Sequence, residues 1–335
     1  MKILVVDVAA ESGGALTILN QFYEEFLQDS SNEYVLCVSK ASLQSTRKVK
    51  VLTFPWVKKS WLRRLWFEYY TAQRIIKRLH IDEVLSLQNL ALSFTNKPQT
   101  VYLHQSLPFE DTKFPLLKEP LFWVYQNIIG LMIIQSVKKA KRIIVQTQWM
   151  KAAIVNKCKV DEAKVEVCPP TLNVHIPRQF SIVNWRRDFF YPATALIYKN
   201  HETLFKAMCI LKQQGIIDYR VLLTVDRGSL PLVCAPYLAQ VQENVVFLGV
   251  IPHKEVMLLY CSSVLVFPSY IESYALAFKE ARLCEAPIIA SDRPFSREIL
   301  SDYEQVVFFP PLDDEALAAS MMVYLNNKPQ KEGNE

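Results

Sequence analysis

The sequence predicts an α/β protein of two domains, each built on an open parallel sheet. Short apolar runs rich in β-branched residues alternate with helical patterns along most of the 335 residues. That length suits about two domains. Two consecutive prolines, Pro169 and Pro170, interrupt the alternation near the middle, as expected of a linker. Each half is therefore predicted to be Rossmann-like, and we expect the two sheets to face one another across a cleft.

The first domain is expected to span residues 1–170. Its helical pattern at 15–27 places Leu16, Leu19 and Phe26 on one face. Its strands are expected at 2–8, 34–38, 84–87, 100–103, 142–146 and 164–167.

The second domain is expected to span residues 171–327, followed by a polar tail at 328–335. Its strands are expected at 188–191, 220–224, 245–248, 264–268 and 288–291. Its helices are expected at 202–214, 254–261, 272–284 and 313–326.

Composition restricts the class of protein further. The chain is 51% hydrophobic, too apolar for a disordered protein. Its seven cysteines are widely spaced, without a C-x-x-C pair, which favours a reducing compartment over a disulfide framework or a zinc site. The N-terminus lacks a signal-peptide layout, and the apolar stretch 121–134 is interrupted by Gln126 and Asn127, so we expect it to be too short to span a bilayer. A cytoplasmic protein is expected.

The charge is unevenly distributed. Residues 1–170 hold 23 Lys and Arg against 15 Asp and Glu, a net +8, whereas residues 171–335 hold 15 against 18, a net −3. An anionic membrane surface or a nucleic acid would suit the first half. No helix-turn-helix, zinc or RNA-binding motif supports nucleic acid, so none is expected as a partner.

One basic and aromatic segment in the first half predicts where a membrane would be contacted. A helix over this segment would place its aromatic residues on one face and most of its cations beside them, as in interfacial helices. The alternative is that the aromatic rings pack into the domain. The predicted membrane contacts are Lys58, Lys59, Trp61, Arg63, Arg64 and Trp66.

Two glutamates in the second half suggest a ligand site. Glu272 is expected at the start of a helix, with Glu280 about 12 Å further along it. That distance matches a nucleotide sugar, whose diphosphate would suit the amides of the first helical turn. The alternatives are chance spacing and ordinary helix capping.

The residues around these glutamates resemble the signature of the retaining nucleotide-sugar glycosyltransferases of family 4, also called group 1, which have the GT-B fold. The matching positions are Phe267-Pro268-Ser269, Glu272, Glu280-Ala281 and the strand at 287–291. The resemblance is clear over residues 185–310 and weaker in the first domain.

The resemblance implies a set of donor-binding residues. Lys199, in the loop after a strand, takes the position of a lysine that contacts the donor diphosphate; otherwise it is a surface lysine before the capping residue Asn200. The sequence departs from the family where Thr194 replaces an arginine that binds phosphate, and where Ser273 and Ala275 replace glycines. The implied donor contacts are Lys199, Gly249, Glu272, Ser273, Tyr274, Ala275 and Glu280.

Two features of the first domain fit the same family. Gly13 and Gly14 open the first helix and would let a phosphate or sugar approach the backbone, although a tight turn needs the same residues. His104 ends a strand where the family often has a residue near the attacked carbon, so it joins Lys199 and Glu272 as a catalytic candidate. The alternative for His104 is a structural role.

The resemblance implies a metal-independent enzyme without a cofactor. It would transfer a sugar, with retention, from a nucleotide diphosphate donor to a glycan or lipid-linked acceptor. Lipopolysaccharide or capsule synthesis, at the inner face of the membrane, is the expected setting. Two alternatives remain open, a non-catalytic relative that binds a glycan or partner and a nucleotide-sugar epimerase or phosphorylase.

Overall fold

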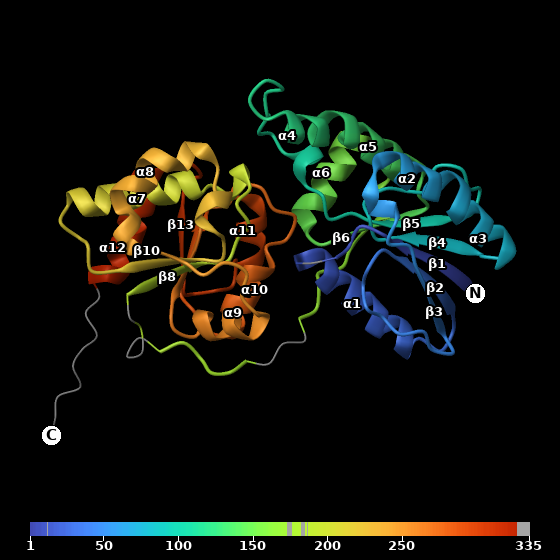
Figure 1. The fold of residues 1–335 in the computed structure, drawn as a ribbon, viewed down its shortest axis with the longest axis horizontal. Coiled ribbons are helices and arrows are strands. Elements are labelled where there is room, and N and C mark those ends of the chain that lie inside the picture. The colour runs from blue at the N-terminus through green and yellow to red at the C-terminus, as the bar shows by residue number, and fades with distance from the viewer. Residues whose placement is uncertain (12, 173–175, 182–184, 186, 327–335) are drawn as a thin grey trace. The chain divides into compact units, whose positions relative to one another are not determined.

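The structure is a computed structural model that describes residues 1–11, 13–172, 176–181, 185 and 187–326. The chain divides into two compact units, Met1–Thr171 and Leu172–Glu335 (Figure 1). The sequence placed a boundary between residues 170 and 171. The expected tail at 328–335 lies outside the described residues.

The first unit is built on a seven-stranded parallel sheet in the order β3-β2-β1-β4-β5-β6-β7. The order places β1 between β2 and β4. Strands β2 and β3 are added on one side of β1 and the later strands on its other side, so the strand order reverses at β1. The strands are β1 (Lys2–Asp7), β2 (Glu33–Val38), β3 (Val49–Thr53), β4 (Glu83–Ser86), β5 (Gln99–Tyr102), β6 (Arg142–Val145) and β7 (Val165–Val167).

Helices cover both faces of this sheet. The helix α1 (Gly13–Gln28) packs on the face that carries Val5 and Ile144. The opposite face carries Leu4, Val84 and Val101, which strand register places on one side. Packed over that opposite face are α2 (Trp61–Trp66), the π-helical turn η2 (Phe67–Thr71), α3 (Ala72–Arg78), α4 (Pro120–Val124), η4 (Tyr125–Ile129), α5 (Gly130–Lys139) and α6 (Gln148–Cys158) (Figure 1).

The second unit has a six-stranded parallel sheet in the order β10-β9-β8-β11-β12-β13. The strands are β8 (Asp188–Tyr191), β9 (Arg220–Leu223), β10 (Val245–Phe247), β11 (Val264–Phe267), β12 (Ile288–Ser291) and β13 (Val306–Phe309). The helices are α7 (His201–Gln213), α8 (Ala235–Val241), α9 (His253–Tyr260), α10 (Leu276–Leu283), α11 (Pro294–Ile299) and α12 (Asp314–Asn326). Here the order reverses at β8, which lies between β9 and β11. The predicted fold class, two Rossmann-like α/β domains, is confirmed.

One boundary prediction is wrong in a way that affects the site. The helix expected to begin at Glu272 begins at Leu276, so Glu272 lies in the loop before it. Ala275 adopts a left-handed conformation, with φ 61°, and a residue in that conformation cannot continue a right-handed helix toward Glu272. The expected helical separation of Glu272 and Glu280 therefore does not apply.

A second correction concerns the apolar stretch in the first unit. The segment Pro120–Lys139 forms 20 residues of continuous helix, long and apolar enough by length and composition alone to cross a membrane. Gln126 and Asn127 lie within this helix, where the Gln126 amide donates to the carbonyl of Thr112 at 2.6 Å and the Asn127 amide to that of Trp123 at 2.8 Å. Part of this helix belongs to the core, since Ile133 and Val137 are fully buried.

Candidate functional site

Two loops at the carboxyl edge of the second sheet are joined by hydrogen bonds. One follows β8 and contains the 3₁₀ turn η7 (Ile197–Lys199), and the other follows the neighbouring strand β11. The side-chain amide of Asn200 donates to the carbonyl of Pro268 at 3.1 Å, and the amide of Tyr270 donates to the carbonyl of Tyr198 at 3.1 Å. These bonds hold the loops together where an open parallel sheet binds ligands.

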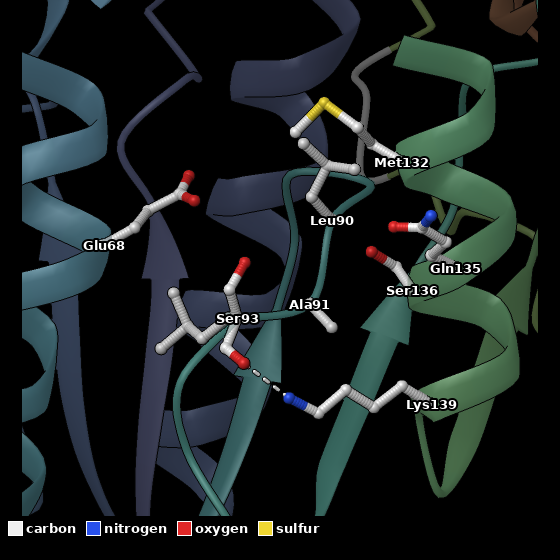
Figure 2. A pocket seen from close by; sticks show the side chains of 9 residues that line it. Glu68, Leu90, Ala91, Ser93, Met132, Gln135, Ser136 and Lys139 are labelled. Carbon is white, nitrogen blue, oxygen red and sulfur yellow. Dashed lines mark hydrogen bonds between the residues drawn. The ribbon is translucent and has the colours of Figure 1, made fainter. Parts of the chain in front are cut away.

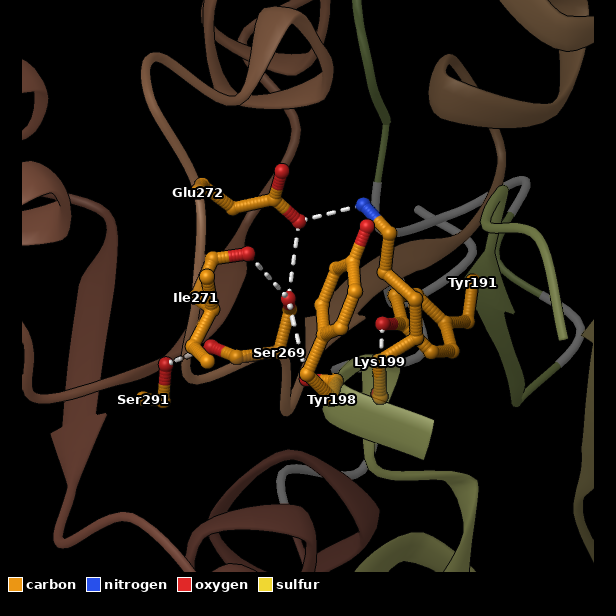
Figure 3. Close-up of polar contacts among 7 residues, drawn as sticks. All are labelled: Tyr191, Tyr198, Lys199, Ser269, Ile271, Glu272 and Ser291. Carbon is orange, nitrogen blue, oxygen red and sulfur yellow. Dashed lines mark hydrogen bonds and ion pairs between the residues drawn. The ribbon is translucent and has the colours of Figure 1, made fainter. Parts of the chain in front are cut away.

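An ion pair between Lys199 and Glu272 lies at this junction. The Lys199 ammonium bonds directly to Glu272 Oε1, and the Ser269 hydroxyl donates to the same oxygen at 2.7 Å (Figure 3). The two side chains are only 16% and 14% exposed. Both charges are therefore shielded from water, which strengthens their interaction with each other and with any ligand that enters.

The backbone that carries Lys199 is fixed by its neighbours. The hydroxyl of the fully buried Tyr191 donates to the Lys199 carbonyl at 2.7 Å. Burial, chiefly, raises the pKa of Tyr191 well above its usual value, so this hydroxyl keeps its proton. Asn200, with a left-handed φ of 60°, occupies the position before the first residue of α7. The ammonium is thus presented from a rigid turn.

His201 follows directly and is neutral. Burial, with a smaller contribution from the Lys199 charge, lowers its pKa to about 4. Neither ring nitrogen bonds to a described protein group. The first turn of α7 therefore adds no further positive side-chain charge beside Lys199.

Glu280 has other partners. Its Oε1 lies 2.8 Å from His253 Nε2, and its Oε2 accepts a hydrogen bond from the Tyr260 hydroxyl at 3.1 Å. The hydrogen bond to Glu280 is the main cause that raises the pKa of His253. The structure thus brings Lys199 and Glu272 together and gives Glu280 partners on α9. Those partners were not predicted from the sequence; His253 is the first residue of α9 and Tyr260 the last.

The other predicted donor contacts lie in loops of the second unit. Gly249 follows β10 with φ 63°, a left-handed conformation that favours glycine, and a Cβ there would lie 3.2 Å from the Asp226 carboxylate. Ser273 and Ala275 lie in the loop between Glu272 and α10, as does Tyr274, which is largely buried.

Two arginines that could replace the one missing at Thr194 are engaged by other groups. Thr194 itself is exposed. Arg187 bonds to the carbonyl of Asp218 and Arg227 to the side chain of Gln242, so both guanidinium groups are engaged. Within the described part of the chain, no group of three or more His, Cys, Asp and Glu side chains is arranged to hold a metal ion.

In the first unit, His104 is paired with Asn89. Asn89 Oδ1 accepts the His104 backbone N–H at 2.8 Å, so its Nδ2 donates to His104 Nε2 at 3.2 Å. The imidazole proton is thereby assigned to Nδ1, which bonds to no described protein group. Burial lowers the pKa of His104 to about 4, so the ring is neutral at pH 7. The ring nitrogen that carries this proton is itself buried.

The carboxyl edge of the first sheet holds two further polar residues that were not predicted from the sequence. Asp7 ends β1, is 3% exposed, and accepts the Ala10 N–H at 3.2 Å. Gln88 is 4% exposed, and neither atom of its side-chain amide bonds to a described protein group. A polar residue at or just beyond the carboxyl end of a strand was the signal available for both.

The structure also shows the predicted phosphate loop, Gly13 and Gly14, and the segment predicted to contact a membrane. Gly13, with φ 59°, and Gly14 begin α1 and are exposed, with open space around a Cβ at Gly13. Lys58 pairs with Glu11 at 3.0 Å, and Arg64 pairs with Glu68 at 3.4 Å. The remaining predicted membrane contacts, Lys59, Trp61, Arg63 and Trp66, are exposed.

Comparison with known proteins finds glycosyltransferase families that match both units. Residues 12–175 match the family described as "Glycosyltransferase Family 4", and residues 176–333 match "Glycosyl transferases group 1". The O-antigen chain mannosyltransferase RfbU of Salmonella typhimurium is 21% identical over 240 residues, which cover 70% of this chain and 64% of that protein.

Solved structures show the same fold at low sequence identity. Sucrose-phosphate synthase from Thermosynechococcus elongatus superimposes with a TM-score of 0.72 and 17% identity over 97% of this chain and 90% of its own. WaaG, a glycosyltransferase involved in lipopolysaccharide biosynthesis, gives 0.72 and 11% over 98% and 91%. HepE from Anabaena, in complex with UDP-glucose, gives 0.68 and 14% over 98% and 90%.

The two family matches meet between residues 175 and 176 and together run from residue 12 to residue 333. With the paired parallel sheets and the loop pair that carries Lys199 and Glu272, they lead to one assignment. This chain belongs to the group 1, or family 4, glycosyltransferases of the GT-B fold.

Proposed function

We propose that this protein transfers a sugar, with retention of configuration, from a nucleoside diphosphate donor to a glycan or lipid-linked acceptor in surface polysaccharide synthesis. The shielded pair of Lys199 and Glu272 at the carboxyl edge of the second sheet carries the proposal. Similarity to an O-antigen mannosyltransferase and to WaaG supports the pathway. Similarity to HepE, whose structure contains UDP-glucose, supports the donor class.

The ion pair explains how the site would respond to a donor. Without ligand, the ammonium of Lys199 is neutralised by Glu272. A diphosphate carries more negative charge than one carboxylate, so it would draw the ammonium toward itself. Glu272 would then be free to accept hydrogen bonds from sugar hydroxyls. One pair of side chains would thus hold both parts of the donor.

The same ammonium would favour the reaction itself. As the bond between the sugar and the diphosphate breaks, the electron pair stays on the diphosphate, and its charge grows. A fixed cation stabilises that developing charge more than it stabilises the intact donor. The acceptor oxygen forms the new bond on the same face of the sugar, and its proton passes to the departing diphosphate. No side-chain nucleophile is required.

His104 would contribute as an uncharged hydrogen-bond donor. Its Nδ1 proton has no acceptor among the described protein groups, and its depressed pKa keeps the ring uncharged. A sugar hydroxyl oxygen would satisfy it once the side chains that cover Nδ1 move aside. The role of His104 would therefore be orientation of a sugar in the first unit rather than proton transfer.

A panel of nucleotide sugars, assayed for transfer and for slow hydrolysis, tests the proposal. Lys199→Ala and Glu272→Gln are each expected to lower kcat/KM with the preferred donor by 100-fold or more, on the order of 3 kcal/mol of transition-state stabilisation. Lys206→Ala is the matched control, because Lys206 forms an ion pair with Glu202 at 2.7 Å in the same unit.

Three outcomes would contradict the proposal. One is unchanged activity in both site variants. Another is a sugar isomerised without any acceptor, which would identify an epimerase. The third is nucleotide-sugar binding with neither transfer nor hydrolysis, which would identify a non-catalytic relative.

A further inference from the structure

The exposed apolar side chains of the first unit gather on one face of its sheet. Apart from Met1, every large apolar residue that is exposed in the described part of this unit belongs to two helical segments or to the loops beside them. None lies on α1, which covers the opposite face. They are Trp61, Leu62, Trp66, Tyr69, Tyr70, Phe94, Leu116, Leu117, Leu121, Ile128 and Leu131.

The two helical segments lie next to one another. A cavity of about 210 Å³ separates them, with Glu68 of the first segment on one wall and Met132 and Lys139 of the second on the other (Figure 2). The loop between β4 and β5 joins them, since the centroid of the Phe94 ring lies 4.3 Å from that of Tyr69 and the Lys139 ammonium donates to the Ser93 carbonyl at 2.6 Å. Residues 57–78 and 113–139 therefore form one surface, which we call the two-helix face.

This face also carries the positive charge of the unit. Residues 57–78 and 113–139 hold eleven Lys and Arg against two Asp and Glu, a net charge of +9. The remainder of residues 1–170 holds twelve against thirteen, a net charge of −1. Almost all of these cations are exposed, among them Lys59, Lys118 and Lys138.

We propose that the two-helix face docks on an anionic membrane, with the helix Pro120–Lys139 lying in the plane of the interface. Exposed tryptophan and tyrosine, apolar side chains and surrounding cations are the combination that binds at a lipid headgroup layer. The seven free cysteines favour the reducing side of such a membrane. This inference does not depend on glycosyl transfer, although a lipid-linked acceptor would be met at the same surface.

The packing of the helix Pro120–Lys139 indicates that it lies on the bilayer and does not cross it. Ile133 and Val137 are fully buried against the sheet, and Gly130 lies so close to Pro108 that a Cβ would come within 3.2 Å of it. Leu121 and Leu131 instead point to solvent, and Leu117, just before the helix, is 96% exposed. One side of the helix thus belongs to the protein core and the other is available to lipid.

The charge also argues against a second copy of the chain as the occupant. A symmetric dimer through this face would bring two surfaces of charge +9 together. Binding to an anionic bilayer is instead stabilised by about 1 kcal/mol for each cation held near its surface.

Vesicle flotation with the full chain tests the proposal. The protein is expected to float with vesicles of phosphatidylglycerol and phosphatidylethanolamine and to remain behind with pure phosphatidylcholine. The triple variant Leu117→Asp, Leu121→Asp, Leu131→Asp is expected to lose binding by 100-fold or more. Lys59→Gln, Arg63→Gln and Lys118→Gln together are expected to weaken binding about 100-fold at low salt, and less at high salt.

Matched controls come from the second unit. Val250 is 97% exposed and Leu232 is 91% exposed, so Val250→Asp with Leu232→Asp should leave vesicle binding unchanged. Unchanged thermal midpoints in all variants would show that folding is intact. Equal binding by the wild-type chain and the triple aspartate variant would overturn the proposal, as would concentration-dependent dimerisation that the triple variant abolishes. Retention of the membrane-bound protein after an alkaline carbonate wash would show a spanning helix instead.

Discussion

Asp7 is a titratable group at the carboxyl edge of the first sheet, and it links stability to pH. Burial, as the largest effect, raises its pKa from 3.8 to about 7, against the lowering effect of hydrogen bonds from Ala10 and Ala9. A raised carboxyl pKa means that the folded chain holds a proton that the unfolded chain releases. Stability is therefore expected to fall as the pH rises from about 4 to about 7.

The variant Asp7→Asn isolates this effect, because an amide oxygen can still accept the Ala10 N–H. The wild-type chain is expected to lose up to about 4 kcal/mol more stability than Asp7→Asn between pH 4 and pH 8. Urea unfolding at the two pH values measures the difference. Parallel losses in the two proteins would show that Asp7 is not the group responsible.

Ala275 is a second residue whose conformation makes a prediction. An alanine with φ 61° is strained by its Cβ, and the resemblance to the family indicates glycine in this loop. Ala275→Gly is expected to stabilise the chain by roughly 1 kcal/mol. Ala277→Gly, inside α10, is the matched control and should cost about 1 kcal/mol. Equal effects of the two substitutions in denaturant unfolding would contradict the argument.

At the scale of elements, α9 and α10 are joined through Glu280, which bonds to residues at both ends of α9. The carboxylate raises the pKa of His253, so the bond to protonated His253 contributes stability at low pH and is lost as the pH rises through the folded pKa. His253 is half exposed, which limits the contribution to well under 1 kcal/mol.

NMR titration of the His253 ring tests this pairing directly. The pKa of His253 is expected to fall toward its ordinary value in Glu280→Gln, because the amide that replaces the carboxylate carries no charge. Glu285→Gln changes another glutamate close to the end of α10 and should leave the His253 titration unchanged. The pairing would be refuted by identical titrations in the wild-type chain and Glu280→Gln.

The elements also show what the sequence could predict. Strands with several consecutive buried residues, such as β1 and β11, were predicted because such runs are typical of a buried parallel sheet. The edge strand β3 was missed because only its first residue, Val49, is buried. Lys199 and Glu272 were predicted as site residues because the motifs around them resemble those of the family. It did not predict that Asn200 joins their loops, because that contact depends on tertiary structure.

At the scale of the whole molecule, each unit contains the parts of an independent domain. The first unit buries Val5 and Leu36 beneath α1, and the second buries every residue of β11 and β12. Each sheet also has its own point of reversed strand order, at β1 and at β8. Donor recognition and membrane contact, as proposed, would therefore be assigned to different units.

This division predicts that ligand binding survives separation of the units. Residues 172–335 produced alone are expected to fold and to bind UDP, ADP or GDP, one of which at 100 times its Kd would add about 2.7 kcal/mol of stability. Lys199→Ala in this fragment should remove the thermal shift, whereas Lys206→Ala should not, because Lys206 pairs with Glu202 on α7 and not with Glu272. Residues 1–171 should show no shift with any of these nucleotides and should retain vesicle binding. A nucleotide that stabilised only residues 1–171 would place the donor in the first unit, and the assignment of Lys199 and Glu272 would then be wrong.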